Sequence, residues 1–248
     1  MIGASGSRVA LVTGASRNIG RQIALSLAAE GCAIVVHTGS NVENATAVVS
    51  EIEAGGGSAF AVVADLGDPA QVSAMISRAH DRLGPIDILV NNVGFRPQKK
   101  FVDITNADWD RVMAVNLDGA FYCCSLSVQD MIAKKQGCII NIVGIAIFNG
   151  GTQYSHVVAA KAGLHGLTKA LAVELGEYGI RVNSVVLGSI DTVRETPVVG
   201  GLPPLATIPL QRRGSVLDVG SVCAFLVSDG ASYITGQAIH VNGGLLLA

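Results

Sequence analysis

Short runs of apolar residues recur along the chain, and between them lie longer segments in which apolar residues follow the period of an α-helix. Seven of these runs predict buried strands, at Val9–Val12, Ala33–Val36, Ala59–Val63, Ile86–Val90, Cys138–Val143, Arg181–Val185 and Ala238–Val241. The longer segments predict helices, the first ending at Ala29 and the others at about Asn41–Ala54, Pro69–Arg82, Trp109–Lys134, Val157–Tyr178 and Val216–Ser228. Because strands that alternate with helices indicate right-handed βαβ units, we expect an α/β fold with one doubly wound parallel sheet and helices on both faces.

No linker, internal repeat or low-complexity tract interrupts this pattern, so the 248 residues are predicted to form a single domain. One connection is unusually long, the Gly- and Pro-rich stretch Thr196–Pro209. Connections of this length within a domain are often functional, and we therefore expect a mobile substrate lid around residues 193–210.

Composition narrows the classes of function. Half of the residues are hydrophobic and 15% are charged, which suits strands buried on both faces and an oligomer that hides further surface. A formal net charge of -2 gives no electrostatic reason to bind nucleic acid or an anionic membrane, and no apolar run is long enough to span a bilayer. The five cysteines lack Cys-x-x-Cys spacing, and the N-terminus lacks the apolar core of a signal peptide. We expect reduced thiols, no zinc site and a cytoplasmic location.

A glycine-rich turn follows the first predicted strand and opens the first helix. It reads Thr-Gly-Ala-Ser-Arg-Asn-Ile-Gly over residues 13–20. Glycines at this place permit a tight turn and a close approach of the backbone to a pyrophosphate, which the helix N-terminus attracts. Taken alone, the segment is equally an ordinary turn between a strand and a helix.

Further motifs follow in a fixed order along the chain: Asp65-Leu66, Asn91-Asn92-Val93-Gly94, Val115-Asn116-Leu117-Asp118-Gly119 and the Tyr154–Gly163 helix. Together with the glycine turn they resemble the short-chain dehydrogenase/reductase family, and within it the beta-ketoacyl-carrier-protein reductases. The resemblance spans essentially the whole chain. It implies a single-domain Rossmann fold, a nicotinamide dinucleotide cofactor and a small carbonyl or alcohol substrate. It also implies a homotetramer, formed through the helices around Asp118–Gln129 and Thr168–Tyr178.

The resemblance assigns cofactor contacts to Gly14, Ser16, Arg17, Asn18, Ile19, Gly20, Ser40, Asp65, Leu66, Asn92, Gly94, Lys161, Gly188 and Thr192. Two of the neighbouring positions depart from the family pattern. Asn18 replaces the middle glycine, and because Asn tolerates left-handed geometry we expect the turn to keep its shape. Leu187 stands before Gly188 where the family has proline.

The end of the second strand bears on the choice of nicotinamide. An NAD site usually places an acid about 20 residues after the glycines, on the ribose hydroxyls, whereas here no acid follows the strand before Glu43. Arg17 lies where NADPH-preferring relatives place a base against the 2′-phosphate, and Ser40 and Asn41 could donate hydrogen bonds to the same group. We expect NADP(H) rather than NAD(H), the alternative being that Arg17 is a solvated loop residue.

The residues expected to orient the substrate and transfer the proton depart further from the family pattern. Its members use a Ser to orient the carbonyl, a Tyr to transfer the proton, a Lys to lower the tyrosine pKa and an Asn to support a proton relay. Asn116 and Lys161 match the last two. Val157 stands where the tyrosine belongs, four residues before Lys161, and Gly144 stands where the serine belongs, thirteen residues earlier still.

Two neighbours are candidate replacements for the missing proton donor. Tyr154 has nearly the right azimuth around the helix but lies one turn too far from Lys161, unless the helix begins only after it. His156 is an apt acid chemically, yet it should face about 140° away from Lys161. The alternatives are a packing tyrosine and a capping or surface histidine.

Other polar residues carry weaker expectations. Arg96, Lys99 and Lys100 follow the fourth strand and could meet an acidic substrate at the mouth of the cleft, or simply be solvated. His165 is expected to be a satisfied interior or interface histidine, and Asp191 either lines the pocket or caps the lid.

Three functions are therefore open. The first is a carbonyl or alcohol oxidoreductase with an atypical proton donor. The second is a catalytically impaired homologue that binds the cofactor as a regulatory or scaffold subunit. The third is non-redox lyase or hydratase chemistry in the same pocket, which the retention of Asn116 and Lys161 disfavours.

Overall fold

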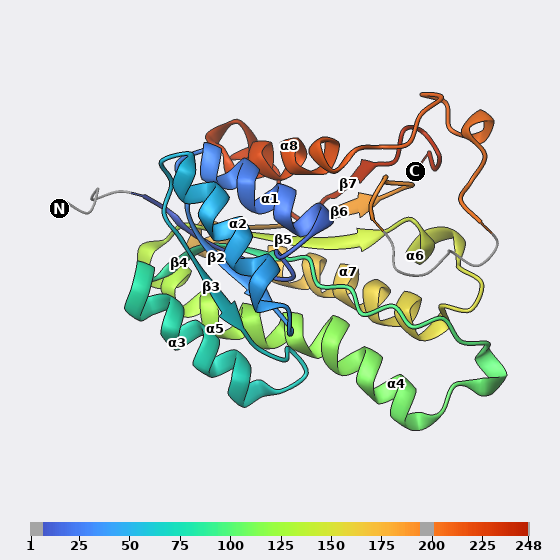
Figure 1. Ribbon diagram of the computed structural model, residues 1–248, viewed down its shortest axis with the longest axis horizontal. Helices are drawn as coiled ribbons and strands as arrows, with labels where there is room; N and C mark the ends of the chain where they lie inside the picture. The colour runs from blue at the N-terminus through green and yellow to red at the C-terminus, as the bar shows by residue number, and fades with distance from the viewer. Residues whose placement is uncertain (1–6, 194–200, 248) are drawn as a thin grey trace.

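The computed structural model describes residues 7–193 and 201–247, and within them a seven-stranded parallel sheet lies between two layers of helices (Figure 1). The strand order is β3-β2-β1-β4-β5-β6-β7. The strands are β1 Val9–Val12, β2 Ala33–Thr38, β3 Ala59–Val63, β4 Ile86–Asn91, β5 Gly137–Gly144, β6 Ile180–Leu187 and β7 Ala238–Val241. The predicted α/β fold and doubly wound parallel sheet are confirmed, and each predicted strand is present with one to three residues added at its ends or none.

Side chains of the central strand point alternately into two separate cores. In β1, Ala10 and Val12 pack into one core, whereas Val9 and Leu11 pack into the other. All four are buried. This is the reason the strands read as continuous apolar runs, since both faces of a parallel sheet are covered by helices.

The helices divide between the two faces, as Figure 1 shows. The layer that covers the first core holds α1 (Asn18–Ala29), α2 (Val42–Ala54) and α8 (Val216–Val227). The layer on the second core holds α3 (Pro69–Leu83), α5 (Gly119–Lys134) and α7 (Ser155–Leu175).

One predicted helix is wrong in its detail. The segment Trp109–Lys134 is not a single α-helix but α4 (Asn106–Met113), a five-residue π-helical turn at Ala114–Asp118 and then α5. A capping box between Thr105 and Asp108 starts α4 three residues earlier than expected. Because a π-turn inserts one residue, it rotates the side chains that follow it relative to a regular helix, and such turns are often found at functional sites.

The remaining elements are short. They are α6 (Ala146–Asn149) and 3-10 helices at Phe101–Asp103, Gly176–Tyr178, Leu205–Thr207 and Asp229–Ala231. The end of the predicted helix Val157–Tyr178 is thus 3-10 rather than α, and its start lies two residues earlier, at Ser155. Within the expected lid, residues 194–200 lie outside the described residues, and 201–210 form turns around Leu205–Thr207.

The order of the strands indicates where on the sheet a ligand site is expected. β1 lies between β2 and β4, so the chain turns in opposite directions from the carboxyl ends of β1 and β4. Crevices at this kind of switch point are where open α/β sheets bind ligands. No helix in the described part of the chain is long and apolar enough to cross a membrane.

Candidate cofactor and active site

The glycine turn leaves β1 and presents the N-terminus of α1 at the carboxyl edge of the sheet. No side chain caps the first turn of α1, so its backbone N–H groups remain open to an anion. Gly20 has no room for a side chain, because a Cβ there would lie 2.1 Å from the Gly14 carbonyl oxygen. Glycine at this position is therefore required by the tight packing of the turn against its own backbone.

Asn92, directly after β4, and His37, within β2, hold this turn in place. The Asn92 side chain donates to the carbonyl oxygens of Thr13 and Gly14, at 2.9 and 3.1 Å. The Gly14 N–H donates to His37 Nδ1 at 3.0 Å, and His37 Nε2 lies 2.9 Å from the Ala64 carbonyl oxygen. These partners require neutral imidazole with its proton on Nε2. Burial lowers the pKa of His37, against the opposing effects of the Ala64 hydrogen bond and of Asp65, and this favours the same neutral form.

Asn18 adopts the left-handed conformation expected of it, with φ 48°. Its amide also forms two hydrogen bonds that the sequence did not predict. Nδ2 donates to the Val193 carbonyl oxygen at 2.9 Å, and Oδ1 accepts from the Val193 N–H at 3.0 Å. A glycine at this position has no side chain to make them, so this chain ties its cofactor turn to the segment that follows β6.

The residues expected to meet the adenosine half of a cofactor are polar. Thr38 Oγ1 donates to Ser16 Oγ at 3.3 Å, and both Arg17 and Ser40 are exposed. Asn41 also caps α2, because its Oδ1 accepts from the Asn44 N–H, and this cap uses the amide oxygen only.

Asp65, another expected cofactor contact, is held in place by hydrogen bonds. Its carboxylate accepts from Arg111 at 2.9 Å and from the Gly67 N–H. Partial burial would raise the pKa of Asp65, but these hydrogen bonds hold it below the usual value. Leu66 is buried directly against Gly119, where a Cβ would lie 2.7 Å from the Leu66 Cβ.

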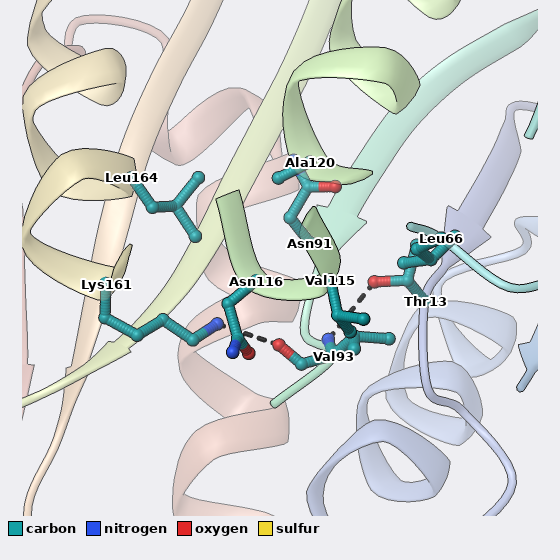
Figure 2. A pocket seen from close by; sticks show the side chains of 9 residues that line it. All are labelled: Thr13, Leu66, Asn91, Val93, Val115, Asn116, Ala120, Lys161 and Leu164. Atoms are coloured by element: carbon teal, nitrogen blue, oxygen red, sulfur yellow. Dashed lines mark hydrogen bonds between the residues drawn. The ribbon is translucent and has the colours of Figure 1, made fainter. Parts of the chain in front are cut away.

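Lys161 and Asn116 line one pocket, which Figure 2 shows, and both bind backbone atoms of the segment after β4. Lys161 Nζ donates to the carbonyl oxygens of Val93 and Ile142, at 2.8 and 3.0 Å. Asn116 Oδ1 accepts from the Phe95 N–H at 2.9 Å, and its Nδ2 donates to the Phe95 carbonyl oxygen at 2.8 Å. The π-turn carries Asn116, so the irregularity in the helix places this amide.

Few interactions stabilise the positive charge of Lys161. Its side chain is 9% exposed, and it forms no ion pair with a carboxylate of any residue that the structure describes. Burial lowers the pKa of Lys161 to about 7, and the positive charge of Arg96 acts in the same direction. Neutral and protonated forms are therefore both accessible near neutral pH.

The two substituted positions are accommodated without strain. Val157 is buried against Val112 and Ala160, so its side chain packs between α7 and α4. Gly144 is the last residue of β5, and the nearest atom to a Cβ there would be the Leu187 carbonyl oxygen at 3.8 Å. A serine would therefore fit at Gly144.

The two candidate proton donors lie near Lys161 in sequence but are not brought to it. Tyr154 precedes α7 as its N-cap residue, and its hydroxyl accepts from Gln98 Nε2. His156 is fully buried, and neither of its ring nitrogens hydrogen-bonds to any part of the chain that the structure describes. Neither residue lines the pocket that Lys161 and Asn116 share.

β6 leads into Gly188 and Thr192, two of the residues expected to contact the cofactor. Gly188 follows it, and a Cβ there would lie 2.6 Å from the Asn242 Cα, so only glycine fits. Thr192 comes next after a bridge between Ile190 and Gly214. His165 is buried with Nδ1 3.0 Å from Ser184 Oγ, as expected of a satisfied interior histidine.

The sequence model described as enoyl-(acyl carrier protein) reductase matches residues 14–246, and this match covers the glycine turn, the Asn116 turn and the Lys161 helix. The chain belongs to the short-chain dehydrogenase/reductase family. It is 42% identical, over 97% of its length and 99% of the relative's, to a 3-oxoacyl-(acyl-carrier-protein) reductase from Staphylococcus aureus. It is 38% identical, over 96% of both chains, to the BbsD subunit of a hydroxy(phenyl)methylsuccinyl-CoA dehydrogenase from Thauera aromatica.

Solved structures give the same relationship in three dimensions. The acetoin dehydrogenase YohF from Salmonella typhimurium superposes with a TM-score of 0.89 at 36% identity, covering 98% of this chain and 97% of that one. At this identity the likeness supports the family as well as the fold. The protein is thus similar to short-chain oxidoreductases along its whole length, and the predicted family is confirmed.

Proposed function

We propose that this protein is an NADP(H)-dependent oxidoreductase that interconverts a carbonyl compound and an alcohol. The observation that carries the proposal is the grip of Lys161 and Asn116 on the segment after β4, beside an uncapped helix N-terminus. An impaired pocket with no use for a cofactor has no reason to retain a buried lysine, because burying its charge is costly.

The residues present fit a dinucleotide. The open N–H groups of α1 and the glycine cradle at Gly20 suit a pyrophosphate, and Asn92 and Gly94 would line its nicotinamide half. Gly188 and Thr192 would close the carboxamide side. When bound, the cofactor supplies or accepts the hydride, and every other part of the reaction falls to the protein.

The adenosine end favours NADP(H). Arg17 places a positive charge at the N-cap of α1, Ser40 is exposed after β2, and no acid ends β2. We expect NADPH to bind at least tenfold more tightly than NADH, as measured by the quenching of cofactor fluorescence. Arg17→Gln should remove that difference, whereas Arg21→Gln, which only breaks an ion pair with Glu51, should leave it intact. Tighter binding of NADH would overturn the assignment.

Proton transfer is the step that the substitutions affect. Lys161 and Asn116 remain in place, but neither a serine nor a tyrosine of the family pattern orients the substrate oxygen. Loss of a positioned general acid costs roughly 10²–10⁴-fold in rate, so turnover should be slow. Tyr154 and His156 remain proposed donors, and either would have to turn towards the pocket when substrate binds.

The deciding experiment compares NADPH oxidation by the native protein with that by the double variant Val157→Tyr, Gly144→Ser on ketones, beta-ketoesters and oxo acids. The single variant Gly144→Ser is a matched control, since a serine fits there. Turnover by the native protein, lost in Tyr154→Phe or His156→Gln, supports the proposal and identifies the donor. Turnover by the double variant alone would contradict it.

That contrary outcome would support a second function, in which the protein binds the cofactor as a regulatory or scaffold subunit. The observation that favours it is the packing of Val157 between helices, where a proton donor would otherwise stand. Binding of NADPH without turnover, in the native protein only, is its signature.

We also propose that the protein is a cytoplasmic homotetramer. Phe121 on α5 and Val173 on α7 are 52% and 86% exposed, and they lie on the two helices that the family resemblance assigns to assembly. The five cysteines are buried and unpaired, as suits a reducing compartment. Light scattering should give four times the chain mass, and Phe121→Glu with Val173→Glu should reduce it.

A further inference from the structure

Three cations follow β4 at the mouth of the site, and they are not equivalent. Lys99 is neutralised by the Asp108 carboxylate. Lys100 is exposed at the start of the Phe101–Asp103 turn. Arg96 is also exposed, and it forms no ion pair or hydrogen bond with any other residue in the described ranges.

Arg96 belongs to the segment that the site grips. Val93 accepts from Lys161, Phe95 exchanges two hydrogen bonds with Asn116, and Arg96 follows directly. Its side chain folds back over the cofactor loop, since a Cβ on Gly94 would lie 3.9 Å from the Arg96 Cγ and Cδ. The backbone that carries Arg96 is thus held by the hydrogen bonds of Lys161 and Asn116 to the residues just before it.

The two cations at this place lack a counter-charge. Lys161 is buried with backbone carbonyls as its partners, and the charge of Arg96 is near enough to lower the pKa of that lysine further. No described carboxylate pairs with either side chain. A site with two adjacent cations and no acid is electrostatically prepared for an anion.

We propose that Arg96 binds a carboxylate of the substrate, so that the protein acts on an oxo acid or hydroxy acid rather than on a neutral ketone. This inference rests on the proposed function and names its substrate class. The guanidinium presents a planar fork of donors that matches a carboxylate in two parallel hydrogen bonds. Such a pair fixes the orientation of the substrate, which the serine at position 144 does in the family pattern.

The bound carboxylate also has a consequence for proton transfer. A negative charge beside Lys161 stabilises its ammonium form and opposes the effect of Arg96. The Lys161 ammonium has three N–H groups, of which two point to backbone carbonyls. The anionic substrate would thus keep the proton on Lys161 in the complex, where the relay towards the substrate oxygen begins.

The test uses pairs of substrates that differ only in charge: acetoacetate with methyl acetoacetate, and pyruvate with methyl pyruvate. Hydrogen bonds between charged groups are worth about 1.5–3 kcal/mol, so kcat/KM should favour each acid over its ester by about 10- to 100-fold. Arg96→Gln should remove this preference by slowing the acid alone. Lys100→Gln, which removes an exposed cation from the same loop, should change neither rate.

Two results would overturn the inference: equal kcat/KM for acid and ester in the native protein, or equal losses on both in Arg96→Gln. A binding measurement separates this from failure of the proposed function. Calorimetric titration of acetoacetate into the protein with NADP⁺ should show binding that Arg96→Gln weakens about tenfold or more. If that binding is present and no substrate turns over, the carboxylate site stands and the oxidoreductase assignment fails.

Discussion

Asn18 combines a left-handed backbone with two hydrogen bonds to the backbone of Val193. Asn18→Ala removes both bonds and places a residue that disfavours this conformation there, so we expect it to destabilise the fold by about 1–2 kcal/mol. Asn18→Gly loses the same bonds but relieves the backbone, and it should cost less than half as much. Urea unfolding of the two variants measures the difference, and equal losses would contradict the strain argument.

Lys161 shows the opposite case, in which a titratable side chain is buried at a cost in stability. Its pKa is lowered from 10.5 to about 7 by burial, so the unfolded chain binds more protons between those two pH values. The stability of the native protein should therefore rise with pH across that window. At pH 7, Lys161→Met should be more stable than the native protein by about 1–4 kcal/mol.

The gain from Lys161→Met should shrink as pH rises from 7 towards 10.5, because the native lysine then loses its charge in both states. Urea unfolding at pH 7, 8.5 and 10 tests this. A gain independent of pH would mean that packing, and not charge burial, sets the difference. The same variant should lose most of its NADPH affinity, which separates stability from function.

At the scale of secondary structure, glycines that touch another element differ from glycines in open space. Gly119 begins α5, and a Cβ there would lie 2.8 Å from the Leu66 carbonyl oxygen, which is backbone and cannot move aside cheaply. We expect Gly119→Ala to destabilise the protein by about 1–3 kcal/mol. Gly176, after α7, has helical backbone angles and no atom near its Cβ position.

Gly176→Ala is therefore the matched control, and it should be neutral or stabilising by about 0.4–1 kcal/mol. Thermal and urea unfolding of both variants would check the pair. Destabilisation of similar size in the two would show that the close contact at Leu66 is not what matters.

The elements themselves were largely predictable, and the exceptions have identifiable causes. Buried strands such as β4 stand out because both their faces are apolar. The π-turn at Ala114–Asp118 does not stand out in the sequence, since one inserted residue leaves the helical periodicity on either side unchanged. The short helix α6 is only four residues long, too short to show a period at all.

The candidate site was likewise predictable in some features and not in others. Asn116 and Lys161 were predictable because they belong to motifs of fixed order, and so was the conformation of Asn18. The contact of His37 with Gly14, and that of Asn18 with Val193, join residues 23 and 175 positions apart. Contacts of this kind depend on how the strands are ordered in the sheet, which no local pattern records.

At the scale of the whole molecule, buried histidines should set the acid limit of stability. Burial lowers the pKa of His37, His156 and His165, in the last case with help from the charge of Lys169. The unfolded chain therefore binds more protons just below about pH 6.5. By linkage, stability is complete above that pH and falls as pH drops towards the folded values.

We expect the free energy of unfolding to fall by about 1 kcal/mol or more between pH 7 and pH 5. Carboxylates held at low pKa, such as Asp218, titrate only below about pH 4 and do not contribute in that window. His156→Leu should flatten the profile, because that imidazole is fully buried without a partner in the described structure. If this substitution leaves the pH dependence of the free energy of unfolding unchanged, groups other than His156 cause the acid sensitivity.

The position of β1 at the centre of the sheet has a consequence for folding during synthesis on the ribosome. β1 pairs on one side with β2, which follows it closely, and on the other with β4. Just after β1, Thr13 donates a hydrogen bond to the Val90 carbonyl oxygen in β4, 77 residues away. At roughly 5–20 residues per second, one apolar edge of the nascent sheet waits roughly 4–15 s for its neighbour. The chain therefore enters the cell with its most aggregation-prone edge uncovered, and its yield in vivo depends on what shields that edge until β4 emerges.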